Sequence, residues 1–266
     1  MQLSGMTSVI TGASSGIGRA LAVQLAEAGC RLVLSALEED LLASLSRELA
    51  DRYSVPVVTR AADLSNADSR SDLIRWILSG VPEPDILINN AGIGGEFGRF
   101  EGISLQGLER VIAVNVSAFV HLTHELIPLL RRRPRAKIVN ISSGIARLPY
   151  PGLAVYGATK GFVSSLSESL ACELAGSKVD VLCFHPGFTD TAFIGASKMD
   201  LSKIPRWMIH SPEQVARSIV RAIRSDARWA FSDLMTRFSI GAGSLLPARI
   251  KGWIFKDIYW RLPDDK

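Results

Sequence analysis

Three side chains in the middle of the chain could together move a proton. Tyr156 and Lys160 lie four residues apart, and Ser143 lies thirteen residues before the tyrosine. Residues i and i+4 share one face of a helix, so the ammonium can lie beside the phenol, where it stabilises the phenolate and lowers a tyrosine pKa of about 10. Alone, the Tyr–Lys pair is more typical of a solvated helix surface than of a catalytic site. With Ser143 it indicates acid–base chemistry on an alcohol or carbonyl.

A glycine-rich turn near the N-terminus could hold a phosphate. A β-branched stretch passes through T-G-A-S-S-G-I-G, at 11–18, into an alanine- and leucine-rich helical pattern. Gly12 permits a tight turn, Gly16 a close approach to a ligand, and Gly18 close packing of helix on strand. The free N–H groups and the dipole of the following helix would then bind a pyrophosphate. An ordinary Gly/Ser loop is the alternative for this motif on its own.

Strand-like and helix-like segments alternate along the chain. The strand candidates are short and rich in Val, Ile and Leu, as in strands buried on both faces. They are Thr7–Ile10, Arg31–Ser35, Pro56–Arg60, Ile86–Asn89, Lys137–Ile141, Val179–Phe184 and Trp229–Phe231, with helical patterns at 16–28, 39–52, 66–79, 104–131, 155–176 and 212–225. This alternation predicts an α/β fold with a doubly wound parallel sheet between two helical layers, and a ligand site at the carboxyl ends of the strands. No linker or repeat divides residues 1–266, so we expect one domain.

Composition and charge narrow the class of protein. Of the 266 residues 47% are hydrophobic and 21% charged, and a net charge of +4 does not by itself call for nucleic acid. Cys30, Cys172 and Cys183 lie far apart without metal-ligand spacing, so we expect reduced core cysteines and no metal site. We find no signal-peptide pattern and no apolar stretch of about 20 residues that would span a membrane, and therefore expect a cytoplasmic protein.

Taken together, these motifs resemble the short-chain dehydrogenase/reductase family in its single-domain branch. Five family signatures occur in the family's order between about residues 6 and 195: Thr11-Gly12-x-x-x-Gly16-x-Gly18, Asn89-Asn90-Ala91-Gly92, Asn115, Ser143 with Tyr156-x-x-x-Lys160, and Pro186-Gly187. The resemblance implies a Rossmann fold of seven strands in the order 3-2-1-4-5-6-7. It also implies an NAD(P)(H)-dependent oxidoreductase that interconverts a secondary alcohol and a ketone, in a homodimer or homotetramer formed through the helices at 104–131 and 155–176.

The resemblance further implies a role for each motif. Tyr156 would exchange a proton with the substrate oxygen, Ser143 would hydrogen-bond that oxygen, and Lys160 would lower the tyrosine pKa and hold the nicotinamide ribose. Asn115 would hold a water in a proton relay to the lysine. Ser142 competes for the serine role but lacks the family spacing to the tyrosine. Asp63 would accept a hydrogen bond from the adenine amino group, or could instead be a helix N-cap or turn carboxylate. The implied cofactor contacts are Gly12, Ser14, Ser15, Gly16, Ile17, Gly18, Asp63, Leu64, Asn90, Ala91, Gly92, Tyr156, Lys160, Pro186, Gly187, Thr189 and Thr191.

The sequence gives only a weak indication of whether the cofactor is NAD or NADP. NAD enzymes usually carry Asp at the end of the second strand, where this chain has Ala36. NADP relatives commonly carry Arg at the next residue or before the second glycine, where Leu37 and Ser15 stand. Glu38 and Glu39 follow and could be first-turn helix carboxylates. Because the aspartate that would repel a 2′-phosphate is absent, the sequence slightly favours NADP(H) over NAD(H).

The segments that line the substrate pocket in the family are apolar here. They are Gly144–Tyr150, Gly94–Phe97 and a loop at 190–212, together with Phe188 just before this loop. Their large apolar side chains are Phe97, Ile145, Leu148, Tyr150, Phe188, Phe193, Ile194, Met199 and Trp207. Such a lining favours a hydrophobic carbonyl or alcohol, although several of these side chains could simply pack a core.

Residues 244–266 form an amphipathic extension outside the motif match. Leu246, Ile250, Trp253, Ile254 and Ile258 fall on one helical stripe, flanked by lysines and arginines. A basic amphipathic helix can lie on a membrane surface, where it would recruit a lipid oxidoreductase. It can also dock on its own fold, cover the pocket or join subunits, and the sequence favours packing within the protein or its oligomer.

Two other features and one rival function remain. His121 and His124 have no third metal ligand beside them, and the arginines of 131–135 suit a solvated helix end better than a nucleic-acid patch. The rival to an enzyme is a non-catalytic NAD(P)-binding or sensing protein on the same fold. Such a module has no need to keep Ser143, Tyr156 and Lys160 together.

Overall fold

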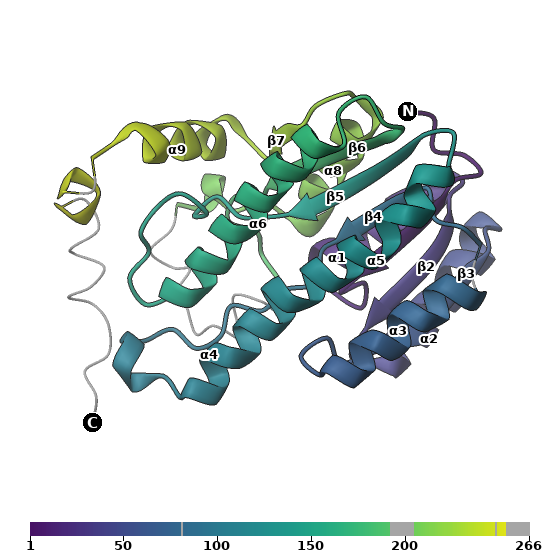
Figure 1. The fold of residues 1–266 in the computed structure, drawn as a ribbon, viewed down its shortest axis with the longest axis horizontal. Coiled ribbons are helices and arrows are strands. Elements are labelled where there is room, and N and C mark those ends of the chain that lie inside the picture. The colour runs from purple at the N-terminus through teal and green to yellow at the C-terminus, as the bar shows by residue number, and fades with distance from the viewer. Residues whose placement is uncertain (81, 192–204, 248, 254–266) are drawn as a thin grey trace.

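The computed structural model describes residues 1–80, 82–191, 205–247 and 249–253 (Figure 1). One parallel sheet of seven strands forms its centre, in the order β3-β2-β1-β4-β5-β6-β7. The strands are β1 (Thr7–Thr11), β2 (Arg31–Ala36), β3 (Val57–Ala61), β4 (Ile86–Asn89), β5 (Ala136–Ile141), β6 (Val179–His185) and β7 (Trp229–Phe231). The α-helices are α1 (Gly16–Glu27), α2 (Glu39–Tyr53), α3 (Ala67–Gly80), α4 (Leu105–Ile112), α5 (Ala118–Arg132), α6 (Ala154–Glu173), α8 (Pro212–Arg224) and α9 (Leu234–Leu245).

Helices cover both faces of the sheet, so the predicted three-layer α/β architecture and strand order are confirmed. One core cluster joins the sheet to α1, α2 and α8 through residues such as Leu21, Leu45 and Ile219. The other joins it to α3, α5 and the end of α6, through residues such as Leu73 and Leu126. In Figure 1, α5 and α6 cross in front of the sheet while α1 and α8 lie behind it. Strand order reverses between β1 and β4, which opens a crevice at their carboxyl ends.

Three elements differ from the sequence prediction. The edge strand β3 alternates between half-buried and exposed residues, because only one of its faces meets the core. The helix predicted at 104–131 is interrupted by a π-helical turn, η2 (Ala113–Ser117), that separates α4 from α5. Helix α9 was not predicted, since its Gly241 and Gly243 weaken the helical pattern.

Two further predictions concern side chains. Cys30 and Cys183 are buried as expected, but Cys172 is exposed because it lies on the outer face of α6. Most of the arginines at the end of α5 are solvated as expected, since Arg131, Arg132 and Arg135 are exposed. Arg133 differs, because it is half-buried and bonds the buried carboxylate of Asp85 at 2.6 Å.

The helical run Leu105–Arg132 is long and apolar enough to cross a membrane, by length and composition alone. Our expectation concerned an uninterrupted apolar stretch of about 20 residues, and Glu109, Arg110 and Glu125 interrupt this run. The run nevertheless qualifies because its mean hydropathy stays high. Because Leu122, Leu126 and Leu130 are buried in the core cluster beside α3, the run has the character of a core helix.

A buried histidine closes β6. His185 is fully buried, and its ring stacks on Trp229 with centroids 4.5 Å apart and on Phe231 at 5.3 Å. Its Nε2 lies 3.1 Å from the hydroxyl of Ser164 on α6. Burial lowers the pKa of His185 to about 4, so the imidazole is neutral at pH 7.

We predict that His185→Phe will make the free energy of unfolding less dependent on pH below neutrality. The folded pKa is depressed below the unfolded value of about 6.5, so His185 stabilises the fold above that pH, and the contribution is lost as pH falls towards 4. Between pH 7 and 5 this loss is about 2 kcal/mol. Urea unfolding at both pH values should show a drop in the free energy of unfolding that is smaller by this amount in the variant. Equal drops would contradict the assignment.

Candidate active site

The glycine-rich turn after β1 has the shape of a phosphate cradle. Gly12 and Gly16 have positive φ angles of 65° and 52°, a conformation that favours glycine. Ser15 caps α1 without a side-chain hydrogen bond, and the first turn of the helix contains no carboxylate. The helix N-terminus therefore keeps its N–H groups and its positive dipole for an anion, which fits the pyrophosphate of a dinucleotide.

The end of β4 holds this turn in place. The Asn90 side-chain amide donates to the carbonyls of Thr11 at 2.9 Å and Gly12 at 3.1 Å. The hydroxyl of Thr11 accepts from the backbone N–H groups of Asn90 and Ala91, both at 3.1 Å. A Cβ atom on Gly18 would lie 2.0 Å from the Gly12 oxygen, so α1 can approach the turn only with glycine there. The Asn-Asn-Ala-Gly motif thus braces the turn through Asn90 and Ala91.

Ser143, Tyr156 and Lys160 meet at the same edge of the sheet. Tyr156 lies in the first turn of α6 and is buried, and the Ser143 side chain hydrogen-bonds its phenol. Lys160 is also buried, with its Nζ atom 5.8 Å from the centroid of the Tyr156 ring. The arrangement can pass a proton between the phenol and an oxygen placed beside Ser143.

Burial dominates the electrostatics of this trio. It raises the pKa of Tyr156 to about 12, against the opposing effect of the Ser143 hydrogen bond. It lowers the pKa of Lys160 to about 8. The expected lowering of the tyrosine pKa by the lysine is thus not seen. Burial has the larger effect on the phenol, and the Nζ atom of Lys160 donates to the Ile141 carbonyl at 2.9 Å.

The two neighbouring serines have different surroundings. The hydroxyl of Ser142 is buried, donates to the Lys160 carbonyl at 2.9 Å and lies 2.7 Å from the hydroxyl of Ser164. It therefore ties β5 to α6. Ser143 is only half-buried and faces the phenol, which supports its selection for the catalytic role.

Asn115 sits in the π-helical turn and joins three elements. Its side chain accepts from the Ile93 N–H at 2.8 Å and donates to the Ile93 carbonyl at 2.9 Å and to Thr159 at 3.0 Å. A Cβ atom on Gly92 would lie 3.2 Å from Lys160 Nζ and 3.3 Å from Asn115 Oδ1. Asn115 thereby places the loop after β4 directly against the lysine, and the water relay stays a prediction.

The segment from Pro186 to Thr191 is held by a carboxylate that sequence reasoning missed. Gly187 N–H donates to Ser232 at 2.8 Å, and Asp233 accepts from Ser232 at 2.7 Å, from Thr236 at 2.7 Å and from the His210 ring at 2.9 Å. Burial would raise the pKa of Asp233, but these hydrogen bonds outweigh it and lower the pKa. The sequence signal was the spacing of Asp233 and Thr236, which is typical of a helix N-cap.

Opposite this segment lies the glycine turn. A Cβ atom on Gly16 would lie 3.1 Å from the Thr191 methyl group, so the two loops close on each other across the crevice. Thr189 donates to the Gly187 carbonyl at 3.0 Å and pairs with His210 in a β-bridge. The predicted cofactor contacts from 12–18 and 186–191 therefore flank one space.

Two carboxylates follow the carboxyl ends of β2 and β3. Asp63 Oδ1 accepts from the Ser65 N–H at 2.8 Å and its hydroxyl at 2.7 Å, and these bonds lower the pKa of Asp63. It thus serves a turn, the alternative raised above, and the buried side chain of Leu64 follows it. The Ser14 hydroxyl donates to Glu38 at 2.7 Å, which places a carboxylate at the exposed rim of the glycine turn.

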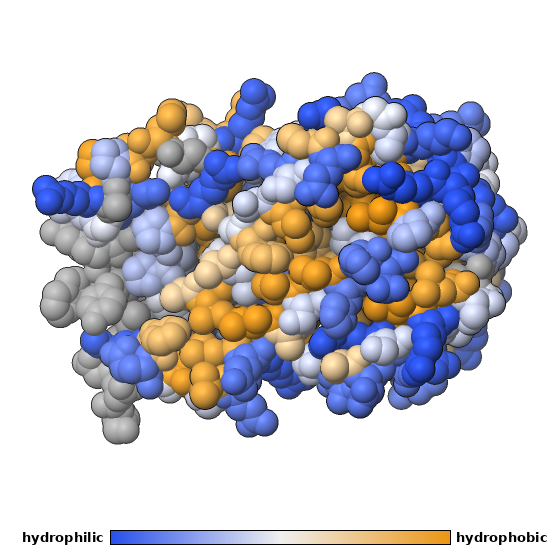
Figure 2. All heavy atoms as spheres, in the orientation of Figure 1, coloured by the Kyte–Doolittle hydropathy of each residue, from blue (hydrophilic) through white to orange (hydrophobic). Residues whose placement is uncertain are grey.

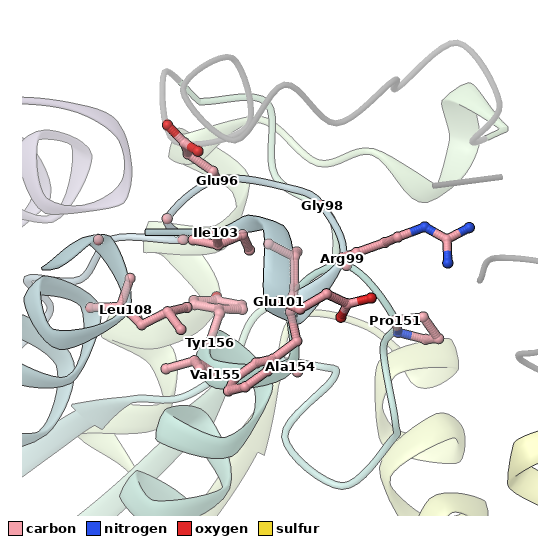
Figure 3. Close-up of a pocket in the computed structure, with 17 residues that line it drawn as sticks. Glu96, Gly98, Arg99, Glu101, Ile103, Leu108, Pro151, Ala154, Val155 and Tyr156 are labelled. Carbon is pink, nitrogen blue, oxygen red and sulfur yellow. The ribbon is translucent and has the colours of Figure 1, made fainter. Parts of the chain in front are cut away.

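A cavity of about 190 Å³ adjoins Tyr156. Ile103, Leu108 and Tyr156 face it, whereas the Arg99 side chain points away (Figure 3). Of the segments expected to line a substrate pocket, Gly94, Gly95 and Glu96 contribute. Phe97, Ile145, Leu148, Tyr150 and Phe188 are not among the described lining residues, Trp207 is exposed, and Phe193, Ile194 and Met199 fall outside the described part of the chain.

Comparison with known proteins shows which family has these features. The family model for short chain dehydrogenases matches residues 6–201. The chain is 35% identical to sulfoacetaldehyde reductase 2 of Chromohalobacter salexigens over 70% of its own length and 73% of that protein. It is 33% identical to the glycine betaine reductase ATRR of Emericella nidulans over 88% of its length, but spans only 19% of that protein.

Solved structures agree over nearly the whole chain. A short-chain dehydrogenase from Sphingobium yanoikuyae in complex with NADPH superposes with a TM-score of 0.82 and 29% identity, covering 98% of this chain and 99% of that one. A short-chain dehydrogenase/reductase from Burkholderia phymatum in complex with NAD gives a TM-score of 0.81 at 26% identity, covering 100% and 99%. The chain belongs to the short-chain dehydrogenase/reductase family of NAD(P)-dependent oxidoreductases.

Proposed function

We propose that this protein interconverts a secondary alcohol and a ketone by hydride transfer, with Tyr156 as acid and base. The observation that carries the proposal is the contact of Ser143 with the buried phenol, beside Lys160 and an apolar cavity. The bound dinucleotide supplies or removes the hydride at its nicotinamide ring. In reduction the substrate carbon accepts that hydride, the Tyr156 O–H gives its proton to the carbonyl oxygen, and Ser143 donates to the same oxygen as charge develops.

The lining of the cavity supports a hydrophobic substrate. Ile103, Leu108, Val111 and Leu153 contribute apolar surface next to Tyr156. At about 190 Å³ the cavity is smaller than the roughly 300–1,000 Å³ of sites for drug-sized ligands. It therefore suits one alkyl or ring substituent of the ketone, with the rest of the substrate reaching out of it.

The cofactor preference rests on Glu38. The carboxylate bonded to Ser14 stands at the rim of the turn where the adenosine ribose of a dinucleotide would lie. A carboxylate there accepts a hydrogen bond from a ribose 2′-OH and repels a 2′-phosphate. We therefore expect tighter binding of NADH than of NADPH, which weighs against the slight preference drawn from the missing aspartate.

A homo-oligomer is part of the proposal. Two exposed apolar side chains, Leu105 and Ile112, lie on α4, and a third, Phe162, lies on α6. Figure 2 shows apolar side chains in a band across the face formed by α5 and α6. A contiguous apolar band of this kind is typical of a protein–protein interface.

The decisive experiment is a titration of the purified protein with NADH and NADPH, followed by nicotinamide fluorescence, and then a screen of hydrophobic ketones. Turnover that is lost in Tyr156→Phe while cofactor binding persists is the expected result. Tight cofactor binding without turnover on any carbonyl or alcohol would indicate the non-catalytic binding protein instead. No binding of either nucleotide would refute both readings.

We predict opposite effects for the two serines. Ser143→Ala should lower kcat/KM by about 10²–10³-fold, as for loss of one donor to a developing oxyanion, with unchanged cofactor affinity and thermal stability. Ser142→Ala should retain most activity but lose about 1 kcal/mol of stability, because a buried hydrogen bond is removed. Steady-state kinetics and urea unfolding of both variants check this. Similar kinetic losses in the two variants would contradict the assignment of Ser143.

We predict that Glu38→Gln will shift the cofactor preference. Removing the charge while keeping a hydrogen-bonding side chain for Ser14 should raise the affinity for NADPH relative to NADH by about tenfold. Glu39→Gln is the matched control, since Glu39 lies in the first turn of α2 and makes no described contact with Ser14. Fluorescence titrations of both variants measure the ratio, and an unchanged ratio in Glu38→Gln would show that this carboxylate does not read the ribose.

A further inference from the structure

Helix α9 shows its apolar face to solvent. Leu234, Phe238 and Leu245 are 82%, 72% and 86% exposed. At 3.6 residues per turn these positions lie within about 40° of one another around the helix. Thr236 and Ile240, on the opposite side, are buried. In Figure 1 α9 lies outside the helical layers, and Figure 2 shows apolar surface over it at the upper left.

The buried side of α9 packs on the loop that follows the catalytic serine. A Cβ atom on Gly243 would lie 2.6 Å from the Leu148 side chain and 3.0 Å from the Arg147 carbonyl. Near the start of the helix, a Cβ atom on Gly144 would lie 3.2 Å from the Thr236 methyl group. The exposed apolar face is thus carried by a helix that is anchored against the active-site rim.

The charged residues within this segment have one sign. Arg237 and Arg249 are exposed on and just after α9, and the helical turn at 249–253 adds the exposed apolar side chains of Ile250 and Trp253. Between Asp233 and Asp257 the sequence has no carboxylate and four cations: Arg237, Arg249, Lys251 and Lys256. An apolar stripe with aromatic side chains and flanking cations is the pattern of a helix that lies in the interface of an anionic membrane.

We propose that the outer face of α9 docks on an anionic lipid bilayer. Leu234, Phe238 and Leu245 insert among the acyl chains, and the exposed arginines contact the headgroups. Docking places the loop at 144–148 near the lipid, so that a hydrophobic ketone could reach the site from the bilayer. Only this last step rests on the proposed function.

A second copy of the chain fits this face less well. In a two-fold dimer the same patch meets itself, so Arg237 and Arg249 of each copy would face the cations of the other. Like charges across an interface oppose association, whereas anionic headgroups attract both arginines. The charge pattern therefore favours lipid over self-association.

The test is co-sedimentation of the full-length protein with vesicles of phosphatidylcholine, with and without phosphatidylserine. The wild type should pellet with the anionic vesicles, and less so at high salt. The triple variant Leu234→Ser, Phe238→Ser, Leu245→Ser should lose at least about tenfold in partitioning, because three inserted side chains are removed. Arg237→Gln with Arg249→Gln should lose about tenfold on anionic vesicles only. The matched control is Leu41→Ser with Leu78→Ser, which removes exposed apolar side chains from α2 and α3.

Several outcomes would overturn the proposal. These are negligible pelleting of the wild type with both vesicles, an equal loss in the control variant, or a triple variant that changes oligomeric state in size-exclusion chromatography without any change in lipid binding. Far-UV circular dichroism and cofactor titration of each variant show that it is folded. Sedimentation needs neither cofactor nor substrate, so vesicle binding by a protein without turnover would leave this inference standing while the proposed function fails.

Discussion

The site depends on how closely the β1–α1 turn approaches the end of β4. There is no room for a side chain at Gly18, and little at Gly12, where a Cβ atom would lie 2.9 Å from Ala91 Cα. This contact brings the start of α1 to the switch in strand order, where parallel strands diverge and leave a crevice. The helix N-terminus, the Asn90 brace and the loop after β4 all take their positions from it. Lys160 then meets Gly92 from the other side.

Burial, and not the attraction between Tyr156 and Lys160, has the largest effect on the pKa of both groups. Desolvation favours the neutral form of both groups, raising the pKa of the phenol to about 12 and lowering that of the ammonium to about 8. A positive charge beside the phenol would stabilise the phenolate in this poorly solvated place more strongly than in water. The pKa of Tyr156 therefore depends on its burial as well as on nearby charges, and the motif spacing alone does not show this.

Patterns along the sequence were sufficient for the sheet and for the residues that meet at its carboxyl edge. Strand runs have a strong local signal, and Tyr156, Ser143 and Gly12 each follow from spacing or from the family resemblance. The same patterns could not give the direction of Lys160 Nζ, which is determined by the Ile141 carbonyl on another element. Nor could they give the π-helical turn at Asn115, since it depends on a side-chain contact with Ile93. Such features arise from tertiary hydrogen bonds that leave no periodicity.

The C-terminal third shows this limit most clearly. Asp233 begins α9 by accepting from the Thr236 N–H at 2.7 Å, and the same carboxylate holds Ser232, which holds Gly187. One side chain thus caps a helix and fixes the loop that faces the glycine turn. Because a half-buried carboxylate with several donors loses free energy when a donor leaves, α9 and the Gly187 loop keep one geometry together. The exposed face of α9 is for this reason mechanically part of the active-site edge, although α9 begins about ninety residues after Ser143 in the sequence.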